Sequence, residues 1–437
     1  MGLIMNVDDA IALFIELWHQ RDPQGSLSPI QEQIFRRSWD GSSYEEIARD
    51  LGYSPHYLRQ VGSQLWQVLG WLTERSVNKT TFRLALAEIG SAAAHSDSPP
   101  IFISRAELPA QLYGRTSTLA LLRNWLDRDC CRLISIRGVG GVGKTALAAK
   151  LVERVGGSFD RVIWHSLFAG GNCTGLVEAI ARRYPKDIPP PTGSNDRVAW
   201  LMAQLRSRRY LIVLDRYDAL FRTGERAGRY ESESKPYERL LERAVVEAHQ
   251  SCLVLTSREQ LANMPSVGNC ARPARELKLS GLLPAAACKL LCDRGLQASP
   301  AELHALTHHY AGNPRALLVA ATLARQKFYG IVAPLLASDK TFPAELEDLL
   351  GTQFARLSAG EKTLACWLAR CDRPTARSAM RSQLRSQFPG RNLTATLDSL
   401  QARSLLSEGG GTCELEPLLR RYLRASHPDV VSNRQAS

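Results

Sequence analysis

The feature that most constrains this chain is a glycine-rich turn between an apolar run at residues 133–137 and a helix-favouring run at residues 146–152. Glycines let backbone N–H groups converge on phosphate oxygens, the lysine reaches the β- and γ-phosphates, and the threonine hydroxyl can bind Mg²⁺. With a strand before it and a helix after it, the turn predicts a phosphate-binding P-loop. The residues expected to contact the nucleotide here are Gly138, Val139, Gly140, Gly141, Val142, Gly143, Lys144, Thr145 and Ala146.

Length and composition are those of an ordinary globular protein. A chain of 437 residues suggests about three domains. The longest apolar run near the start, residues 10–15, is followed by Glu16 and is far too short to span a membrane. We therefore expect a cytoplasmic protein with no membrane partner. The ten cysteines do not indicate a disulfide framework in a chain of this size.

One set of cysteines and histidines comes close to zinc-finger spacing. Cys288 and Cys292 are followed by His304 and His308. Both cysteines lie in a helix-favouring run that would place them one turn apart, whereas a zinc finger needs a chain reversal between them. The pattern favours helix residues over metal ligands.

Residues 1–90 predict a helical domain that contains a helix-turn-helix. Ser43 and Glu46 form a capping box that opens one helix, a turn follows at Gly52, and Ser54 caps the next helix. The predicted helices begin after Asn6 and at residues 29, 44 and 55, with the second extending through Phe35.

Two functions are open to this domain. A DNA-binding version would use residues 43–70 and present one polar face to a major groove. Residues 1–90 contain eight basic and eleven acidic residues, a net charge of −3, so the rest of the chain carries +15. Because phosphate neutralisation dominates DNA affinity, we favour a protein-interaction bundle over DNA binding. The predicted DNA-facing residues are His56, Arg59, Gln60, Ser63 and Gln64.

Past an expected linker at residues 91–112, β-type runs alternate with helical patterns. This alternation predicts a doubly wound α/β fold with a five-stranded parallel sheet. Asp215 ends one apolar run and Arg258 follows another, so both lie at carboxyl ends of strands, where ligands bind. Asp215 is expected to hold Mg²⁺ through water, and Arg258 to report a γ-phosphate. The strand runs after the P-loop strand lie at 161–165, 210–215, 252–256 and 277–279, with helical patterns at 196–205 and 237–249; from about Leu282 the strands stop and helices take over.

These motifs occur in the order and spacing of NB-ARC domains of the STAND class of signalling NTPases, which the chain resembles from about residue 100 to 425. The motifs that carry the resemblance are 113–115, 138–145, 211–215, 255–258 and 312–317. The resemblance implies that Tyr113, Gly114 and Arg115 contact the adenine side of ATP or ADP and that Pro314 packs on the base or sugar. It also implies that Arg258 senses the γ-phosphate.

The resemblance further implies a multidomain architecture. A helix-turn-helix domain such as residues 1–90 fronts many bacterial members. The implied parts that follow the linker are a P-loop NTPase domain at 113–280, a helical domain at 281–340, a winged-helix domain at 341–425 and a polar tail at 426–437.

Two positions depart from the family pattern. Arg216 stands where such domains often carry a second acidic residue, with Asp218 two places on as a substitute base. A missing general base slows hydrolysis by about 10²–10⁴-fold, so we expect at most a slow ATPase. The histidine of the winged-helix motif would fall at 415–417, where Glu416 stands instead, and an acid there would not attract the phosphates of ADP. The catalytic candidates are Lys144, Asp215, Asp218 and Arg258, with Thr145 and Asp215 as metal ligands.

The resemblance implies a molecular switch. ADP would keep the parts closed, and exchange for ATP with Mg²⁺ would open them for self-association. The alternatives are an ATP-regulated transcription factor that binds an operator through residues 43–70, and a fast ATPase motor, against which Arg216 argues. Family members usually carry a C-terminal repeat array that senses the trigger, whereas a short polar tail follows Tyr422 here. We therefore expect either a separate sensor or effector protein or a shortened relative.

Overall fold

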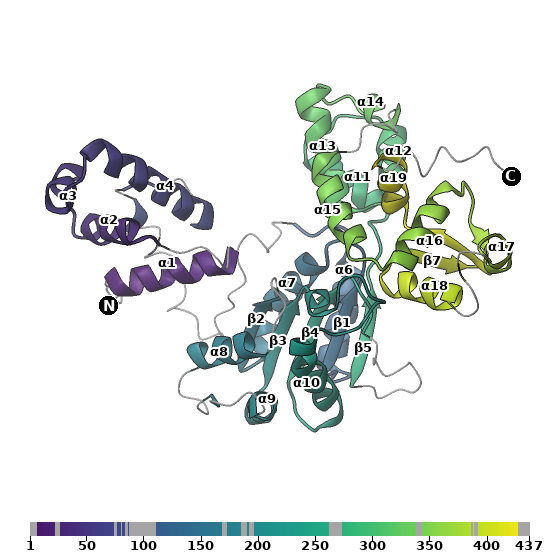
Figure 1. The fold of residues 1–437 in the computed structure, drawn as a ribbon, viewed down its shortest axis with the longest axis horizontal. Coiled ribbons are helices and arrows are strands. Elements are labelled where there is room, and N and C mark those ends of the chain that lie inside the picture. Colours follow the sequence, from purple (N-terminus) through teal and green to yellow (C-terminus); the bar gives the residue numbers. More distant parts are fainter. Residues whose placement is uncertain are drawn as a thin grey trace. The chain divides into compact units, whose positions relative to one another are not determined.

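The computed structural model divides the chain into two compact units, Met1–Pro100 and Ile101–Ser437 (Figure 1). The expected cap at Asn6, most of the expected linker and nearly all of the expected tail lie outside the described residues. Within the described ranges, no helix is both long and apolar enough to cross a membrane. The described residues are 7–21, 27–73, 77–79, 81–83, 86, 111–167, 173–184, 190–191, 196–261, 273–337, 343–385, 388 and 392–426.

The first unit confirms the predicted helices. Capping boxes at Ser28 and Ser43 open the second and third helices, and Gly52 ends the third with a φ of +72°. The second helix runs past the predicted Phe35. The helices are α1 (Val7–Arg21), α2 (Pro29–Trp39), α3 (Tyr44–Leu51) and α4 (Pro55–Thr73). The core of the first unit includes the aromatic side chains of Phe14, Phe35, Trp66 and Phe82.

A glycine allows α3 and α4 to approach closely. A Cβ on Gly62 would lie 2.1 Å from the Tyr44 hydroxyl oxygen, so a larger residue would displace the tyrosine ring. The Trp66 indole N–H donates to that hydroxyl at 2.8 Å. The predicted polar face of α4 is exposed, and its only arginine, Arg59, pairs with Glu45 of α3.

The second unit begins with the predicted five-stranded sheet, in which all paired strands are parallel and the order is β2-β3-β4-β1-β5. Helices α6 and α7 cover one face of the sheet, and α8, α9 and α10 cover the other. The strands are β1 (Leu133–Arg137), β2 (Arg161–Ser166), β3 (Tyr210–Asp215), β4 (Cys252–Ser257) and β5 (Ala274–Lys278). The helices are α6 (Thr116–Asp127), α7 (Lys144–Val155), α8 (Thr174–Arg183), α9 (Asp196–Ser207) and α10 (Lys235–Val246), with short 3₁₀ turns η1 (Gly156–Ser158), η2 (Tyr217–Leu220) and η3 (Ser232–Ser234).

The last strand lies earlier than predicted. The apolar pattern placed it at 277–279, but β5 begins at Ala274 and ends at Lys278. It is an edge strand with mostly half-buried side chains, so charged residues are tolerated in it and the apolar run marks only its end.

The expectation that strands stop after Leu282 was wrong. Among the C-terminal helices lies a three-stranded antiparallel sheet in the order β6-β8-β7. These strands have two to four residues each, too few for a period to be read from the sequence. The sheet agrees with the implied winged-helix domain, which stays a prediction. The helices are α11 (Pro284–Asp293), α12 (Pro300–His309), α13 (Pro314–Lys327), α14 (Ala333–Ala337), α15 (Ala344–Ala355), α16 (Ala359–Arg370), α17 (Arg377–Gln383), α18 (Asn392–Ala402) and α19 (Pro417–Ser426), and the strands are β6 (Thr375–Ala376), β7 (Leu406–Gly409) and β8 (Thr412–Leu415).

Two separate cores organise this C-terminal part. One joins α11–α14 with Leu346 and Leu350 of α15 and Leu418 of α19, and the other extends from Leu357 through α19. Helix α15 therefore packs with the helices that precede it and also with α19, and the predicted boundary at residue 341 stays a prediction. Cys288 and Cys292 both lie on α11, which confirms the helix expected there.

Candidate functional site

The glycine-rich loop joins β1 to α7 at the carboxyl edge of the sheet. Gly141 and Gly143 have φ angles of +79° and +98°, which favour glycine. A Cβ on Gly138 would lie 2.6 Å from the carbonyl oxygen of Leu279. The loop is therefore shaped by positions that admit no side chain, as a backbone cradle for phosphate requires.

Lys144 lies buried at the start of α7 with its amine turned into the loop. Its Nζ donates to the carbonyl oxygens of Gly138 at 2.8 Å and Val139 at 2.9 Å. Burial lowers the pKa of Lys144 to about 8, because desolvation outweighs the attraction of Asp218 and Asp215. A phosphate in the loop would supply the anion that this buried amine lacks.

A buried carboxylate faces the first turn of α7. Asp215, at the end of β3, is 1% exposed. Its Oδ1 accepts hydrogen bonds from the hydroxyls of Thr145, at 2.9 Å, and Thr256. Its Oδ2 is buried without a hydrogen-bond partner among the described residues. Since oxygen ligands are those that Mg²⁺ prefers, this carboxylate oxygen, which makes no hydrogen bond and lies beside a threonine hydroxyl, fits the predicted metal site.

The predicted Arg258 lies directly beyond β4 and faces Asp218. Its backbone N–H donates to Asp218 Oδ1 at 2.9 Å, and its Nε lies 3.9 Å from Oδ2. Lys144 and Arg258 thus meet the two aspartates at one edge of the sheet, as the sequence predicts. One Asp218 oxygen thus accepts the backbone N–H of Arg258 and the other faces its guanidinium, and a role of Asp218 as the base stays a prediction.

Arg216 adopts a left-handed conformation with a φ of +59°. Its N–H donates to the Thr256 hydroxyl at 2.9 Å, and its Nε lies 3.9 Å from Asp215 Oδ2. The arginine side chain is about half exposed, at 51%. The Arg216 side chain therefore cannot act as a general base next to Asp215.

The residues expected on the adenine side contact protein groups. The Tyr113 hydroxyl donates to Asp293 at 3.0 Å. Arg115 is 8% exposed and donates to the carbonyl oxygens of Ser280 at 2.6 Å and Val142 at 3.4 Å. Gly114 abuts Ala286, whose Cβ would lie 2.4 Å from a Cβ on the glycine. The three residues tie the P-loop to α11, and their contact with adenine stays a prediction.

The Gly-Asn-Pro turn before α13 contacts the phosphate-binding loop through Asn313, to which the sequence analysis gave no role of its own. Asn313, which is 3% exposed, donates from Nδ2 to the carbonyl oxygen of Gly140 at 2.8 Å while its Oδ1 caps α13. The predicted Pro314 lies with its Cγ 4.0 Å from the Cβ position of Gly143. Asparagine before proline is itself a helix-start signal, so the cap could have been found, although the contact with the loop could not.

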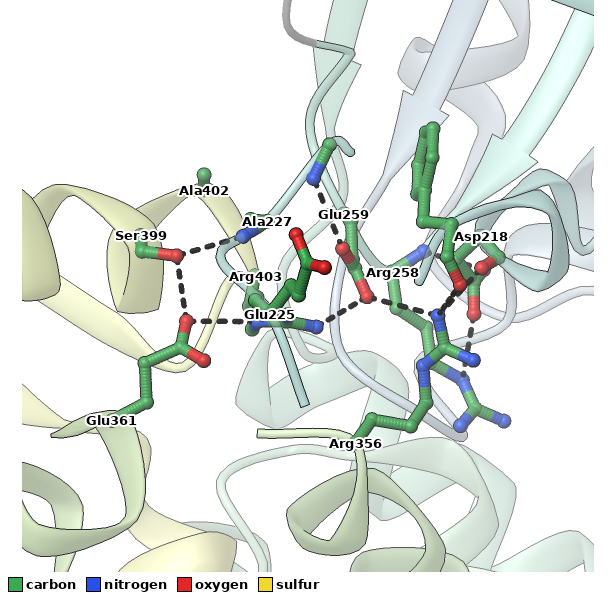
Figure 2. A network of polar contacts seen from close by, with 12 residues as sticks. Asp218, Glu225, Ala227, Arg258, Glu259, Arg356, Glu361, Ser399, Ala402 and Arg403 are labelled. Carbon is green, nitrogen blue, oxygen red and sulfur yellow. Dashed lines mark hydrogen bonds and ion pairs between the residues drawn. The ribbon is translucent and has the colours of Figure 1, made fainter. Parts of the chain in front are cut away.

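A buried charged network connects the sheet to the C-terminal part (Figure 2). Its centre is Glu259, the neighbour of Arg258, which is 2% exposed. Glu259 is paired with Arg403 and, at 3.3 Å, with Arg356. Burial raises the pKa of Glu259, and the two arginines oppose that rise. The sequence did not reveal this cluster, because Glu259 is 97 residues from Arg356 and 144 from Arg403 and nothing local marks a charge as buried.

Arg403 is the hub of this network and is 3% exposed. Besides Glu259 it donates to Glu361 Oε1 at 2.9 Å and to the carbonyl oxygen of Glu225 at 2.6 Å. Glu361 also accepts from the Ser399 hydroxyl at 2.6 Å. Each of the three guanidinium nitrogens of Arg403 therefore donates to a protein oxygen.

Glu416, which stands where the winged-helix histidine was expected, has a structural contact of its own. It precedes α19, and its Oε2 accepts the backbone N–H of Leu419 at 2.8 Å. Desolvation raises the pKa of Glu416 to about 7. The residue caps a helix.

Two segments match known families. Residues 115–218 match the family described as NB-ARC domain. Residues 5–89 match the family described as vWA-MoxR associated protein N-terminal HTH. The NB-ARC match supports nucleotide binding by the second unit, and the second match supports the helix-turn-helix of the first unit.

Curated relatives are much longer than this chain. It is 32% identical over 328 residues to an uncharacterized WD repeat-containing protein of Nostoc sp., covering 71% of this chain and 26% of that protein. It is 30% identical over 123 residues to a probable disease resistance protein of Arabidopsis thaliana, covering 27% of this chain and 13% of that protein. The chain thus spans about a quarter or less of these relatives.

Solved structures resemble the chain distantly. A Signal Transduction ATPase with Numerous Domains (STAND) protein with a tetratricopeptide repeat sensor from Pyrococcus horikoshii is 18% identical with a TM-score of 0.38, covering 73% of this chain and 43% of that one. A Walker-type ATPase of Pyrococcus abyssi is 16% identical with a TM-score of 0.49, covering 73% of this chain and 97% of that one.

Proposed function

We propose that this protein is a nucleotide-controlled molecular switch of the STAND type. ADP would stabilise a closed arrangement of the second unit, and exchange for ATP with Mg²⁺ would open it for self-association. The observation that carries the proposal is the network around Glu259, which joins the residue next to Arg258 to the C-terminal part. Different affinities of ADP and ATP for the closed and open arrangements would supply the switching free energy.

Residues of the loop and of β3 would hold the nucleotide. The backbone N–H groups of 138–145 and the amine of Lys144 would bind the phosphates, and Thr145 with Asp215 would hold Mg²⁺. When bound, the metal ion would neutralise charge between the β- and γ-phosphates. The support for this assignment is the buried, partner-poor oxygen of Asp215 and the desolvated amine of Lys144.

Arg258 would couple the γ-phosphate to the network. In the closed arrangement its guanidinium faces Asp218 at 3.9 Å. An Arg258 that turned to a γ-phosphate would leave Asp218, and its covalent neighbour Glu259 would be pulled against Arg356 and Arg403. Because this cluster is buried, small displacements of its charges are costly.

Hydrolysis would be slow. Arg216 replaces the second acidic residue next to Asp215, and Asp218, the substitute base, has one oxygen that accepts the backbone N–H of Arg258. A general base contributes about 10²–10⁴-fold to such a rate. A slow ATPase is sufficient for a switch, because the nucleotide state needs to outlast the signal.

The test is to identify the nucleotide released on denaturing the purified protein and to measure the mass of the native protein with ADP and with ATP. We expect ADP in a monomer and larger assemblies with ATP. Lys144→Ala should abolish nucleotide binding, and Arg258→Ala should retain binding but lose ATP-dependent assembly. A Lys144→Ala variant that binds ADP like the wild type would refute the proposal.

A second candidate is an ATP-regulated DNA-binding protein. The exposed polar face of α4 supports it, whereas the pairing of Arg59 with Glu45 and the net charge of −3 over residues 1–90 weaken it. A salt titration of DNA binding by the full chain would decide between them. A steep salt dependence with sequence preference, lost in Arg59→Ala, would favour the DNA-binding function.

A further inference from the structure

Helix α15 covers the apex of the phosphate-binding loop. A Cβ on Gly140 would lie 3.3 Å from Gln353 Oε1 and 3.3 Å from Leu349 Cδ1, both on α15. A Cβ on Gly141 would lie 3.4 Å from Leu349 Cδ2. The C-terminal part therefore contacts Gly140 and Gly141 of the loop directly, in addition to its contacts with Glu259.

The amide of Gln353 is buried there and unused. The residue is 5% exposed, and neither its Oε1 nor its Nε2 has a hydrogen-bond partner among the residues the structure describes. Asn313, beside the same loop, uses both of its polar atoms. Buried amides are nearly always paired, so a doubly unpaired one indicates that a partner is missing from this structure.

We propose that Gln353 is a nucleotide-binding residue whose Nε2 donates to the terminal phosphate of ADP held by residues 138–145. This inference rests on the proposed function, since it requires a nucleotide in the loop. The loop directs its N–H groups at phosphate oxygens, so an amide against its apex lies beside the anion. A phosphate oxygen can accept from Gln353 as well as from the loop.

The assignment gives the closed arrangement a nucleotide contact from its C-terminal part. Glu416 caps α19 and has no positive charge with which to bind a phosphate. Gln353 supplies a neutral donor on α15 instead, which binds phosphate without the desolvation cost of a buried charge. ADP would then link the loop to α15, and its loss would leave a buried amide unpaired and favour opening.

The test is Gln353→Met in the full chain, a nearly shape-matched change that removes both polar atoms. After removal of bound nucleotide, the ADP dissociation constant is measured by calorimetry and the unfolding temperature is measured without nucleotide. We expect the ADP dissociation constant to rise about tenfold, the effect of losing one hydrogen bond to a charged group. The unfolding temperature without nucleotide should stay the same or rise, because an unpaired amide is replaced by an apolar group.

A matched control is Gln204→Met on α9, a buried glutamine whose Oε1 accepts from the Tyr210 hydroxyl at 3.3 Å. It should lower the unfolding temperature and leave ADP affinity unchanged. An unchanged ADP dissociation constant in Gln353→Met, with a lower unfolding temperature, would overturn the inference and make Gln353 a structural residue. Gln353→Leu repeats the measurement if the methionine variant does not fold. If Lys144→Ala loses ADP binding but both Gln353 variants bind ADP as tightly as the wild type, this inference alone is refuted. If Lys144→Ala still binds ADP, the proposed function is refuted.

Discussion

Replacing Arg403 by methionine should loosen the C-terminal part from the nucleotide-binding sheet. The change removes the cation shared by Glu259 and Glu361, which are 2% and 0% exposed. Breaking a buried ion pair from one side costs about 3–5 kcal/mol when the remaining charge stays buried. Glu259 can regain water if the contact opens, so we expect the loss to appear first as local opening and only in part as global unfolding.

The assay is native-state hydrogen exchange combined with equilibrium unfolding in urea. In Arg403→Met, exchange should accelerate in the segment 221–230, whose Glu225 carbonyl accepts from Arg403, and in α18. Adding Glu259→Gln should recover part of the loss, because burial already raises the pKa of Glu259 and a neutral amide suits that site better than an unpaired carboxylate.

The matched control is Glu225→Gln. Glu225 also pairs with two arginines, Arg222 at 3.0 Å and Arg229 at 3.1 Å, but at the surface. It should leave exchange and stability unchanged. Similar effects in Arg403→Met and Glu225→Gln would refute the argument that burial makes the network hold the two parts together.

Three further outcomes are expected. Glu416→Gln should match the wild type near pH 4, where the carboxyl is protonated in both states, and exceed it by about 3 kcal/mol in urea unfolding at pH 8. Since the folded-state pKa is raised to about 7, wild-type stability falls as the pH rises from the ordinary carboxyl value through 7, and an equal difference at both pH values would contradict this. Asp215→Asn should keep Mg²⁺-free ADP binding but lose the gain from added Mg²⁺, measured by calorimetry, because the asparagine oxygen can still accept from Thr145; a retained Mg²⁺ effect would remove Asp215 from the metal site. Gly141→Ala should lower the free energy of unfolding by about 1–3 kcal/mol and weaken ADP binding. The reason is that Gly141 has a φ of +79° and that a Cβ there would lie 2.8 Å from Asn313 Oδ1. The control is Gly157→Ala, which should change neither quantity, because nothing lies within 4 Å of a Cβ at that position.

Local signals determined much of this molecule. The P-loop followed from glycine, lysine and threonine between a strand and a helix, and the capping box at Ser43 marked a helix start correctly. The central strands were recognised because they are buried on both faces and therefore uniformly apolar. The five-stranded parallel sheet and the placement of Asp215 and Arg258 at the ends of two of its strands followed from these runs.

Local signals failed where the pattern was short or where exposure was mixed. The edge strand β5 carries charged residues, so its start at Ala274 was missed. The strands of the C-terminal sheet are shorter than one readable period. The packing of α15 could not be read locally either, because its Leu346 and Leu350 share a core with the preceding helices and with Leu418 of α19, far along the chain.

Only the tertiary structure decided which polar residues of the second unit are buried and paired. Glu259, Arg403 and Gln353 look in the sequence like ordinary surface residues, since glutamate, arginine and glutamine are usually exposed. Burial and pairing are properties of two segments brought together, and neither segment alone records them. The sequence therefore determined that a nucleotide can be bound, because the loop is built from adjacent residues, whereas the contacts that couple the loop to the C-terminal part depend on side chains about a hundred or more residues apart.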